Sequence, residues 1–202
     1  MTLSLPVARL FCLVSAADDL SLLPALADAG VDGFQVRAKD LPTRDLVAMT
    51  RSVVAAVRHH PAQVIVDDRL DVALAAGAHG VHLGAGDLAV ADARRLAPQL
   101  IIGATCRARS AVEAAAAHGA DYAGFGPVFA TESKAGLPAP LGVAALTAAG
   151  GALPLIAIGG VDASRAARLA EAGAHGIAVI GAIWRHPDPV GAAKELVQTL
   201  GS

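Results

Sequence analysis

Side chains suited to anion chemistry gather at the end of the predicted second strand. Gln35, Arg37 and Lys39 alternate there with apolar residues, and alternate residues of a strand project to the same face. Burying two cations costs several kcal/mol unless an anion compensates them. We therefore expect Arg37 and Lys39 to bind an anionic ligand such as a diphosphate. A structural ion pair with Asp68 is the competing interpretation.

Two carboxylates follow the next two predicted strands. Asp68 lies in the acidic sequence of residues 67–69 after the third strand, and Asp87 comes shortly after the fourth. Mg²⁺ commonly takes one or two carboxylates together with substrate phosphate oxygens. We therefore predict a magnesium site on Asp68 and Asp87. A helix N-cap is the alternative role for Asp87.

The loop after the sixth strand is suited to closing over a phosphate. It spans residues 129–141 and contains Thr131, Ser133 and Lys134. Loops of this length in a compact α/β domain are usually functional. A solvated polar loop would have the same composition, so the loop supports a phosphate site only together with other signals.

Glycines follow the last two predicted strands. Glycine lets a phosphate approach backbone N–H groups closely. In (β/α)₈ barrels the loops after strands seven and eight often bind phosphate in this way. The residues at these two strand ends are Gly159, Gly160, Ile180 and Gly181.

These side chains need a scaffold that brings strand ends together. Short β-branched runs alternate with Ala-rich stretches, a pattern typical of buried strands and helices. The runs are residues 8–15, 33–38, 63–68, 80–84, 100–106, 122–126, 154–159 and 176–182. Eight such strands with eight helices predict an α/β fold, a TIM (β/α)₈ barrel. A doubly wound sheet is disfavoured because no GxGxxG turn follows the first strand.

A repeat supports this division of the chain. Residues 29–34, 76–81, 118–123 and 172–177 each place a glycine three residues before a predicted strand. Glycine readily takes the left-handed conformation that ends helices. The repeat predicts that every second strand follows a helix ended by glycine.

Composition limits the classes of function. The 202 residues suit a single domain, here 1–202. Hydrophobic residues make up 54% of the chain, yet none of their runs reaches the roughly 20 residues of a membrane span. The net charge is −2 with scattered Lys and Arg, so we expect neither nucleic-acid nor membrane partners. Small phosphorylated molecules remain as substrates.

Other reactive side chains are given structural roles. Cys12 and Cys106 lack CxxC spacing, which predicts two buried thiols in a cytoplasmic protein without a secretory signal. Cys106 has no neighbouring base in sequence, so nucleophilic catalysis is not expected. His82 is expected to be packed and hydrogen-bonded. An exposed Trp184 is the candidate contact for a homodimer.

The ordered motifs of the chain resemble the superfamily of thiamine phosphate synthases and thiazole tautomerases. The resemblance covers nearly the whole chain. It rests on Gln35-x-Arg37-x-Lys39, Asp67-Asp68-Arg69, Val81-His82-Leu83-Gly84-x-x-Asp87, Gly126-Pro127-Val128-Phe129-x-Thr131-x-Ser133-Lys134, Pro140-Leu141-Gly142 and Ala157-Ile158-Gly159-Gly160.

The resemblance implies a synthase that joins hydroxymethylpyrimidine diphosphate to thiazole phosphate and releases diphosphate. It implies that Arg37, Lys39 and Lys134 are catalytic, with Mg²⁺ on Asp68 and Asp87. It assigns the binding of the two substrates to a larger set, namely Gln35, Asp67, Thr105, Thr131, Ser133, Gly159, Gly160, Ile180 and Gly181.

Two alternatives to the synthase stay open. A thiazole tautomerase is one, but Pro127 stands where a studied branch carries its acid-base His, and proline cannot transfer a proton. A binder of thiamine phosphate without turnover is the other. Asp67, Ala85 and Gly181 stand where Asn, Gln and Ser are usual in synthases, and these differences bear on the substrate.

Overall fold

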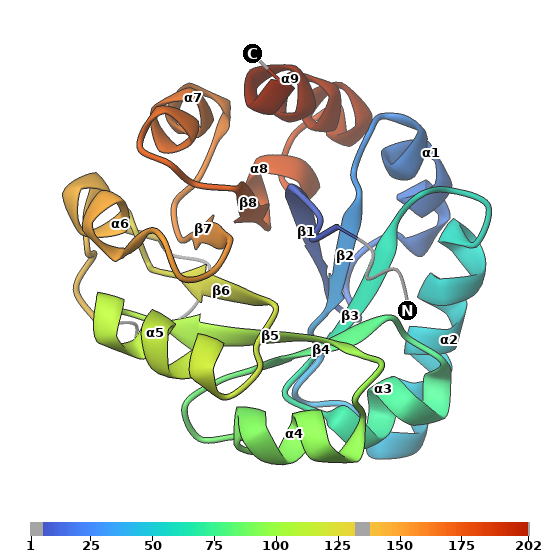
Figure 1. Cartoon of the computed structure of the whole chain (residues 1–202). Coiled ribbons are helices and arrows are strands. Elements are labelled where there is room, and N and C mark those ends of the chain that lie inside the picture. The colour runs from blue at the N-terminus through green and yellow to red at the C-terminus, as the bar shows by residue number, and fades with distance from the viewer. Residues whose placement is uncertain (1–5, 132–137, 202) are drawn as a thin grey trace.

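A computed structural model describes residues 6–131 and 138–201. Its strands are parallel and pair in chain order, and β8 pairs with β1, which closes the barrel (Figure 1). Each strand lies within the run predicted for it, so the predicted (β/α)₈ fold is confirmed. The strands are β1 (Leu10–Val14), β2 (Gly33–Val36), β3 (Gln63–Asp67), β4 (Gly80–Leu83), β5 (Ile101–Cys106), β6 (Tyr122–Phe125), β7 (Leu155–Ile158) and β8 (Gly176–Val179).

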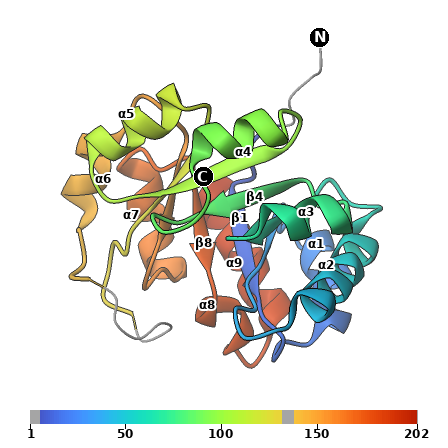
Figure 2. The ribbon, with the colours of Figure 1, turned by 90° about the horizontal axis from the view of Figure 1, so that it is seen from below.

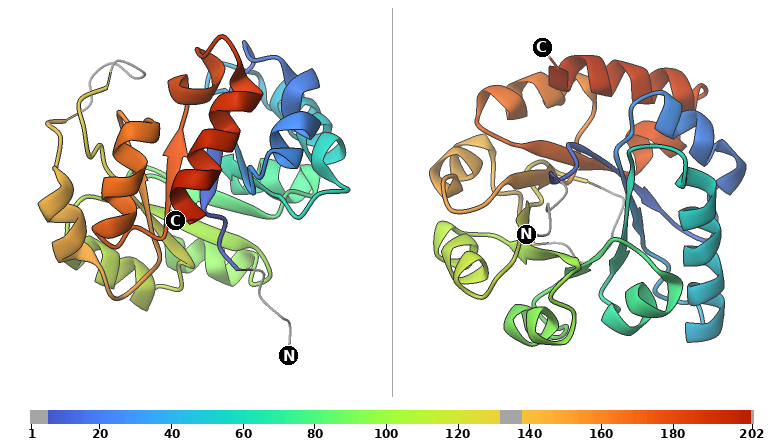
Figure 3. Two further views of the ribbon diagram at one scale, coloured as in Figure 1. Left: turned by 90° about the horizontal axis from the view of Figure 1, so that it is seen from above. Right: turned by 45° about the vertical axis from the view of Figure 1, so that its right-hand side comes forward.

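A ring of helices covers the outside of the barrel (Figure 3). A short turn, α8, follows β8, and α9 then packs on α7, α8 and α1 to complete the ring. The helices are η1 (Leu20–Leu22), α1 (Leu23–Asp28), α2 (Thr43–Val57), α3 (Leu70–Ala76), α4 (Val90–Leu96), α5 (Arg109–Ala117), α6 (Val143–Ala149), α7 (Ala163–Glu171), α8 (Gly181–Trp184) and α9 (Pro189–Gly201). Within the described residues, no helix is long and apolar enough to span a bilayer.

Alternation along the strands separates two buried layers. In β1, Leu10, Cys12 and Val14 face the helices and belong to the large outer core. Phe11 and Leu13 face the barrel axis and belong to a smaller inner cluster. Strands buried on both faces explain why the runs are continuously apolar rather than alternating with polar residues.

Large inner side chains are accommodated by glycines on neighbouring strands. Phe11 is in register with Gly33, and Gly103 is in register with Tyr122. A Cβ on Gly33 would lie 2.6 Å from Cδ1 of Phe11, and one on Gly103 would overlap Cζ and the hydroxyl of Tyr122. These glycines give the aromatic rings their space inside the barrel.

The repeated glycines end helices as predicted. Gly30, Gly77, Gly119 and Gly173 have φ of 103°, 71°, 91° and 90°. These values are in the left-handed region, which favours glycine. The repeat is therefore a backbone device that turns the chain from a helix into the next strand.

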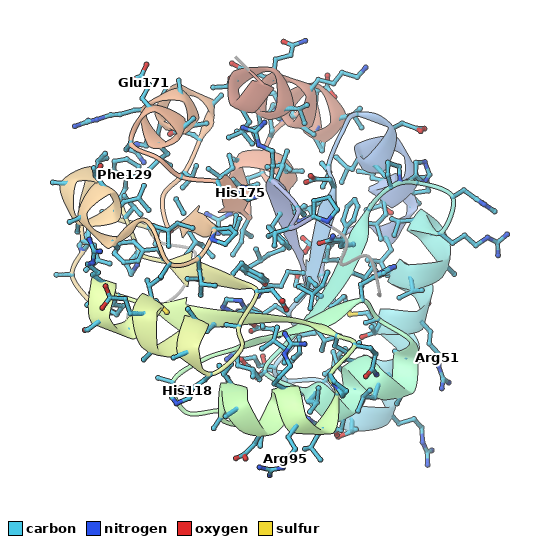
Figure 4. All side chains as sticks on the ribbon, viewed as in Figure 1. Arg51, Arg95, His118, Phe129, Glu171 and His175 are labelled. Carbon is cyan, nitrogen blue, oxygen red and sulfur yellow. The ribbon has the colours of Figure 1, made fainter. Side chains whose placement is uncertain are left out.

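The side chain of Trp184 is packed within the fold, contrary to the sequence-based expectation. Trp184 is half-buried and its Nε1 donates to the Leu13 carbonyl at 2.6 Å. It fastens α8 to β1, so the expectation that its side chain is exposed is wrong. By contrast, Arg51, Arg95 and Glu171 project outward from the ring in Figure 4.

Replacing Gly103 with alanine should destabilise the protein by about 1 to 3 kcal/mol, because the new methyl group overpacks the core. Urea unfolding measures the difference. Gly86→Ala is the matched control, since a Cβ there meets nothing within 4 Å and Gly86 has no positive φ. Equal stability of the two variants would contradict the assigned packing of Tyr122.

Candidate active site

A pocket of about 740 Å³ opens at the carboxyl ends of the strands. Figure 2 gives a side view, with α8 at the end of the barrel where β8 finishes. Ser133 and Lys134 lie outside the described residues. The other predicted site residues all line the pocket, namely Gln35, Arg37, Lys39, Asp67, Asp68, Asp87, Thr105, Thr131, Gly159, Gly160, Ile180 and Gly181.

The cations after β2 are paired with carboxylates after β3. Arg37 Nε lies 3.3 Å from Asp67 Oδ2. Lys39 Nζ lies 2.6 Å from Asp68 Oδ2 and 3.9 Å from Asp67 Oδ2. The ion pair with Asp68 is therefore present, and both cations also line the pocket. A structural ion pair and a role in anion binding are therefore compatible for these residues.

Asp67 is the most deeply buried member of this cluster, with 10% of its side chain exposed. Its Oδ1 accepts a hydrogen bond from Gln35 Nε2 at 2.8 Å. Burial raises the pKa of the Asp67 carboxyl to about 6, and the charge of Asp68 contributes, against the opposing effects of Lys39 and Arg37. Asp67 is thus easier to protonate than an ordinary carboxylate.

Asp68 has a strained backbone. Its φ is 65°, the one positive φ of a non-glycine residue in the described chain, and such strain costs of order 1–3 kcal/mol. The Asp68 N–H donates to the His82 carbonyl at 2.8 Å, which holds this conformation. Burial opposes ionisation of Asp68, but hydrogen bonds from Lys39 and Asp87 leave its pKa below the usual value. Strain of this kind is common at functional sites.

Asp87 does not cap a helix. Helix α4 begins at Val90 with Ala89 as N-cap and no side-chain capping bond. Asp87 Oδ2 instead accepts from the Gly84 N–H at 2.7 Å, so the N-cap alternative is wrong because the helix starts later than expected. Partial burial raises the pKa of Asp87, and the contact with Asp68 raises it further.

The contact between the carboxylates of Asp68 and Asp87 fits a divalent cation. Two carboxylates in direct contact repel one another when both are ionised, and a cation removes that cost. Across the described residues, no cluster of three or more His, Cys, Asp or Glu side chains offers another metal site. Two carboxylates are a sufficient protein contribution for Mg²⁺ when a substrate supplies phosphate oxygens.

A chain of polar side chains crosses the pocket floor. His82 Nδ1 lies 3.1 Å from the Tyr122 hydroxyl, and His82 Nε2 lies 2.9 Å from Thr105 Oγ1. Burial lowers the pKa of His82 to about 4 and raises that of Tyr122 well above its usual value, so both groups are neutral near pH 7. The expectation of a packed, hydrogen-bonded His82 is confirmed.

The proton positions in this chain follow from the available partners. Within the described structure, His82 is the one hydrogen-bond partner given for the Tyr122 hydroxyl. We assign the Tyr122 hydroxyl as the donor to His82 Nδ1, because a buried hydroxyl hydrogen without an acceptor is costly. This assignment leaves the His82 Nε2–H as the donor to Thr105. The Thr105 hydroxyl hydrogen is left free to face the pocket, where Thr105 is exposed.

Two arginines at the opposite side of the pocket were missed from the sequence. Arg165, in the first turn of α7, lies 4.9 Å over the Phe129 ring and donates to the Gly160 carbonyl. Arg185 follows α8 and also lines the pocket. The sequence signal that could have identified Arg165 and Arg185 is their position shortly after the glycines at the ends of β7 and β8.

Cys106 is not an active nucleophile in this arrangement. Its side chain is buried, and burial raises the pKa of the thiol to about 11. A thiol with this pKa is protonated at neutral pH. The expectation that the site does not use a cysteine nucleophile agrees with this environment.

Comparisons with known proteins give one consistent family. The protein-family model described as thiamine monophosphate synthase matches residues 10–183 of this chain. The thiamine-phosphate synthase of Chlorobium phaeovibrioides is 46% identical over 174 residues, which cover 85% of this chain and 83% of that protein. A thiamine biosynthesis bifunctional protein of Symbiobacterium thermophilum is 44% identical over 191 residues, which cover 93% of this chain but 40% of that protein.

A solved structure agrees with the sequence comparisons. Thiamine phosphate pyrophosphorylase from Pyrococcus furiosus superposes with a TM-score of 0.87 at 31% sequence identity. The superposition covers 96% of this chain and 95% of that one. The resemblance found in the motifs is confirmed, and the chain belongs to the thiamine monophosphate synthase family.

Proposed function

We propose that the protein is a thiamine-phosphate synthase, a transferase that joins hydroxymethylpyrimidine diphosphate to thiazole phosphate. The observation that carries the proposal is one pocket lined by charged side chains and glycines at two sets of strand ends. Paired cations and carboxylates follow β2, β3 and β4, while glycines and arginines follow β7 and β8. Two phosphorylated substrates fit such a pocket, one at each end.

The reaction breaks one bond and forms another without a base. The bond between the pyrimidine methylene carbon and the diphosphate oxygen breaks, and its electron pair leaves with diphosphate. The pyrimidine ring stabilises the resulting cation. The thiazole nitrogen then donates its lone pair to the methylene carbon, which gives the thiazolium of thiamine phosphate. No proton has to be removed in these steps.

Leaving-group stabilisation is the main task of the chain. Arg37 and Lys39 are held at the pocket by Asp67 and Asp68, so their charges are oriented before substrate binds. Preorganised charges of this kind stabilise negative charge that develops in a transition state. Lys134, carried by the loop after β6, is proposed as a third cation.

Mg²⁺ is proposed as the cofactor, held by Asp68 and Asp87. When bound, it would neutralise diphosphate charge as a Lewis acid. The strained backbone of Asp68 and the contact between the two carboxylates support this assignment. Lys39, the hydrogen-bond partner of Asp68, stays beside the same diphosphate.

Orientation of the pyrimidine is assigned to the pocket floor. We assign Thr105 as a hydrogen-bond donor to the ring, because His82 directs the Thr105 hydrogen into the pocket. Gln35 and Asp67 form the neighbouring polar edge. Asp67 and Ala85 differ from the usual synthase residues, so we expect the shape and charge of this part of the pocket to differ from those usual in synthases.

The proposed setting is the cytoplasm, with small phosphorylated molecules as ligands and no nucleic acid or membrane. The scattered charge of the chain and its two buried thiols support this setting. A homodimer is proposed without a contact residue, since Trp184 packs within the chain.

The purified protein should form thiamine phosphate from the pyrimidine diphosphate and thiazole phosphate with Mg²⁺, and EDTA should abolish formation. Thiochrome fluorescence after oxidation measures the product. If no product forms, the unrearranged thiazole carboxylate phosphate is supplied next. Its aromatisation would select the tautomerase, and tight binding of thiamine phosphate without turnover would select the binding protein.

Asp87→Asn should raise the Mg²⁺ concentration needed for half-maximal activity by at least about tenfold. Asparagine keeps an oxygen to accept the Gly84 N–H but removes the charge that attracts the cation. Asp92→Asn is the matched control, because Asp92 lies on α4 and pairs with Arg95. Activity is titrated with Mg²⁺ for each variant, and identical titrations would refute the assignment of Asp87 as a ligand.

Tyr122→Phe should lower kcat/KM for the pyrimidine diphosphate by about tenfold, because His82 loses the partner that fixes its proton on Nε2. The KM for thiazole phosphate should not change. Nitrogen NMR of the His82 ring checks the cause, since the variant should show a mixture of tautomers. A wild-type ring with its proton on Nδ1 would contradict the proposed direction of the hydrogen bonds.

A further inference from the structure

Within the described residues, Arg185 differs from the other cations of the pocket because its side chain has no acidic or carbonyl partner. Arg37 and Lys39 are paired with carboxylates, and Arg165 bonds the Gly160 carbonyl and lies 3.8 Å from Asp162. Of the Lys and Arg side chains that the structure describes at this pocket, only that of Arg185 has neither an acidic nor a carbonyl partner. Its charge is therefore available to a ligand.

The stem of Arg185 packs against the glycine that follows β8. A Cβ placed on Gly181 would lie 3.3 Å from Arg185 Cδ and 3.5 Å from Arg185 Nε. The backbone N–H of Arg185 donates to the Gly181 carbonyl at 3.1 Å, which fixes the turn between them. The absence of a side chain at Gly181 thus lets the guanidinium group lie beside the backbone at the end of β8.

In the described structure, the acidic side chains near Arg185 do not form ion pairs with it. A second cavity of about 370 Å³ adjoins the first and is lined by Arg185, Asp162 and Glu195. Asp162 is engaged by the Arg165 N–H and the Ser164 hydroxyl. In the described structure neither Asp162 nor Glu195 forms an ion pair with Arg185, so the guanidinium is not neutralised from the second cavity.

A phosphate group bound at the glycine-rich end of the pocket would be stabilised by a positively charged side chain. A phosphate monoester carries between one and two negative charges near neutral pH, and backbone N–H groups alone supply no full charge. The cations after β2 are separated from the end of β8 by β1 and are paired with Asp67 and Asp68. Arg165 and Arg185, from the segments after β7 and β8, are the described cations at the glycine-rich end.

We propose that Arg185 binds the phosphate monoester of the thiazole substrate and makes the enzyme select the phosphorylated over the unphosphorylated thiazole. The inference rests on the proposed function and assigns a specificity-determining residue to it. A guanidinium group can donate two parallel hydrogen bonds to phosphate oxygens, a geometry that lysine cannot reproduce. Arg165, whose guanidinium group lies over the Phe129 ring, adds positive charge at the same end of the pocket.

Arg185→Gln tests the proposal, because glutamine retains part of the stem and removes the charge. Its KM for thiazole phosphate should rise by about tenfold or more, as expected for loss of a charged hydrogen bond. The preference for thiazole phosphate over the thiazole alcohol should fall by a similar factor, and the KM for the pyrimidine diphosphate should stay unchanged. Arg185→Lys should recover part of the preference.

Arg168→Gln is the matched control, since Arg168 is exposed on α7 and does not line the pocket. An unchanged preference in Arg185→Gln, or an equal rise in KM for both substrates, would overturn the proposal. If the wild-type protein makes no thiamine phosphate, inorganic phosphate is titrated calorimetrically instead. Weaker binding to Arg185→Gln than to wild type would retain the phosphate site while the synthase fails, and equal binding would reject the site as well.

Discussion

Arg37 and Lys39 follow one strand, Asp67 and Asp68 follow its neighbour, and the parallel pairing of β2 with β3 brings these four charges together. Charges that are removed from water need partners of opposite sign. The barrel supplies these partners from the adjacent strand end, so the cations remain oriented at the pocket without a ligand. The site beside them is therefore a consequence of strand order and register.

The same closed barrel gives the pocket two electrostatically different ends. Near β2, β3 and β4, positive and negative side chains compensate one another. An anionic ligand would therefore bind best there together with a cation. Near β7 and β8, Arg165 is paired with Asp162, whereas Arg185 has no acidic partner in the described structure. Under the proposed function, a diphosphate and a phosphate monoester would thus be distinguished by their surroundings, although both are anions.

Sequence patterns predicted the strands and most of the site because both depend on alternation and on strand ends. Tyr122 was missed because an aromatic residue in an apolar run looks like core, and its polar contact with His82 depends on both side chains facing across the glycine of the strand between them. Arg185 was missed because its place depends on the short turn α8, which leaves no periodic signal. The same turn buries Trp184, and the late start of α4 removed the capping role expected for Asp87.

Lys39 shows how ligand binding would change the cluster under the proposed function. Its ammonium group has three N–H donors and could contact the Asp68 carboxylate and a diphosphate together, but the two anions would then share one positive charge. A divalent cation on Asp68 and Asp87 would compensate the carboxylate charge and release Lys39 toward the anion. Thermodynamic linkage then requires each ligand to strengthen the binding of the other. Under the proposed function, the 2.6 Å contact between Lys39 and Asp68 would therefore weaken when the divalent cation and the diphosphate bind.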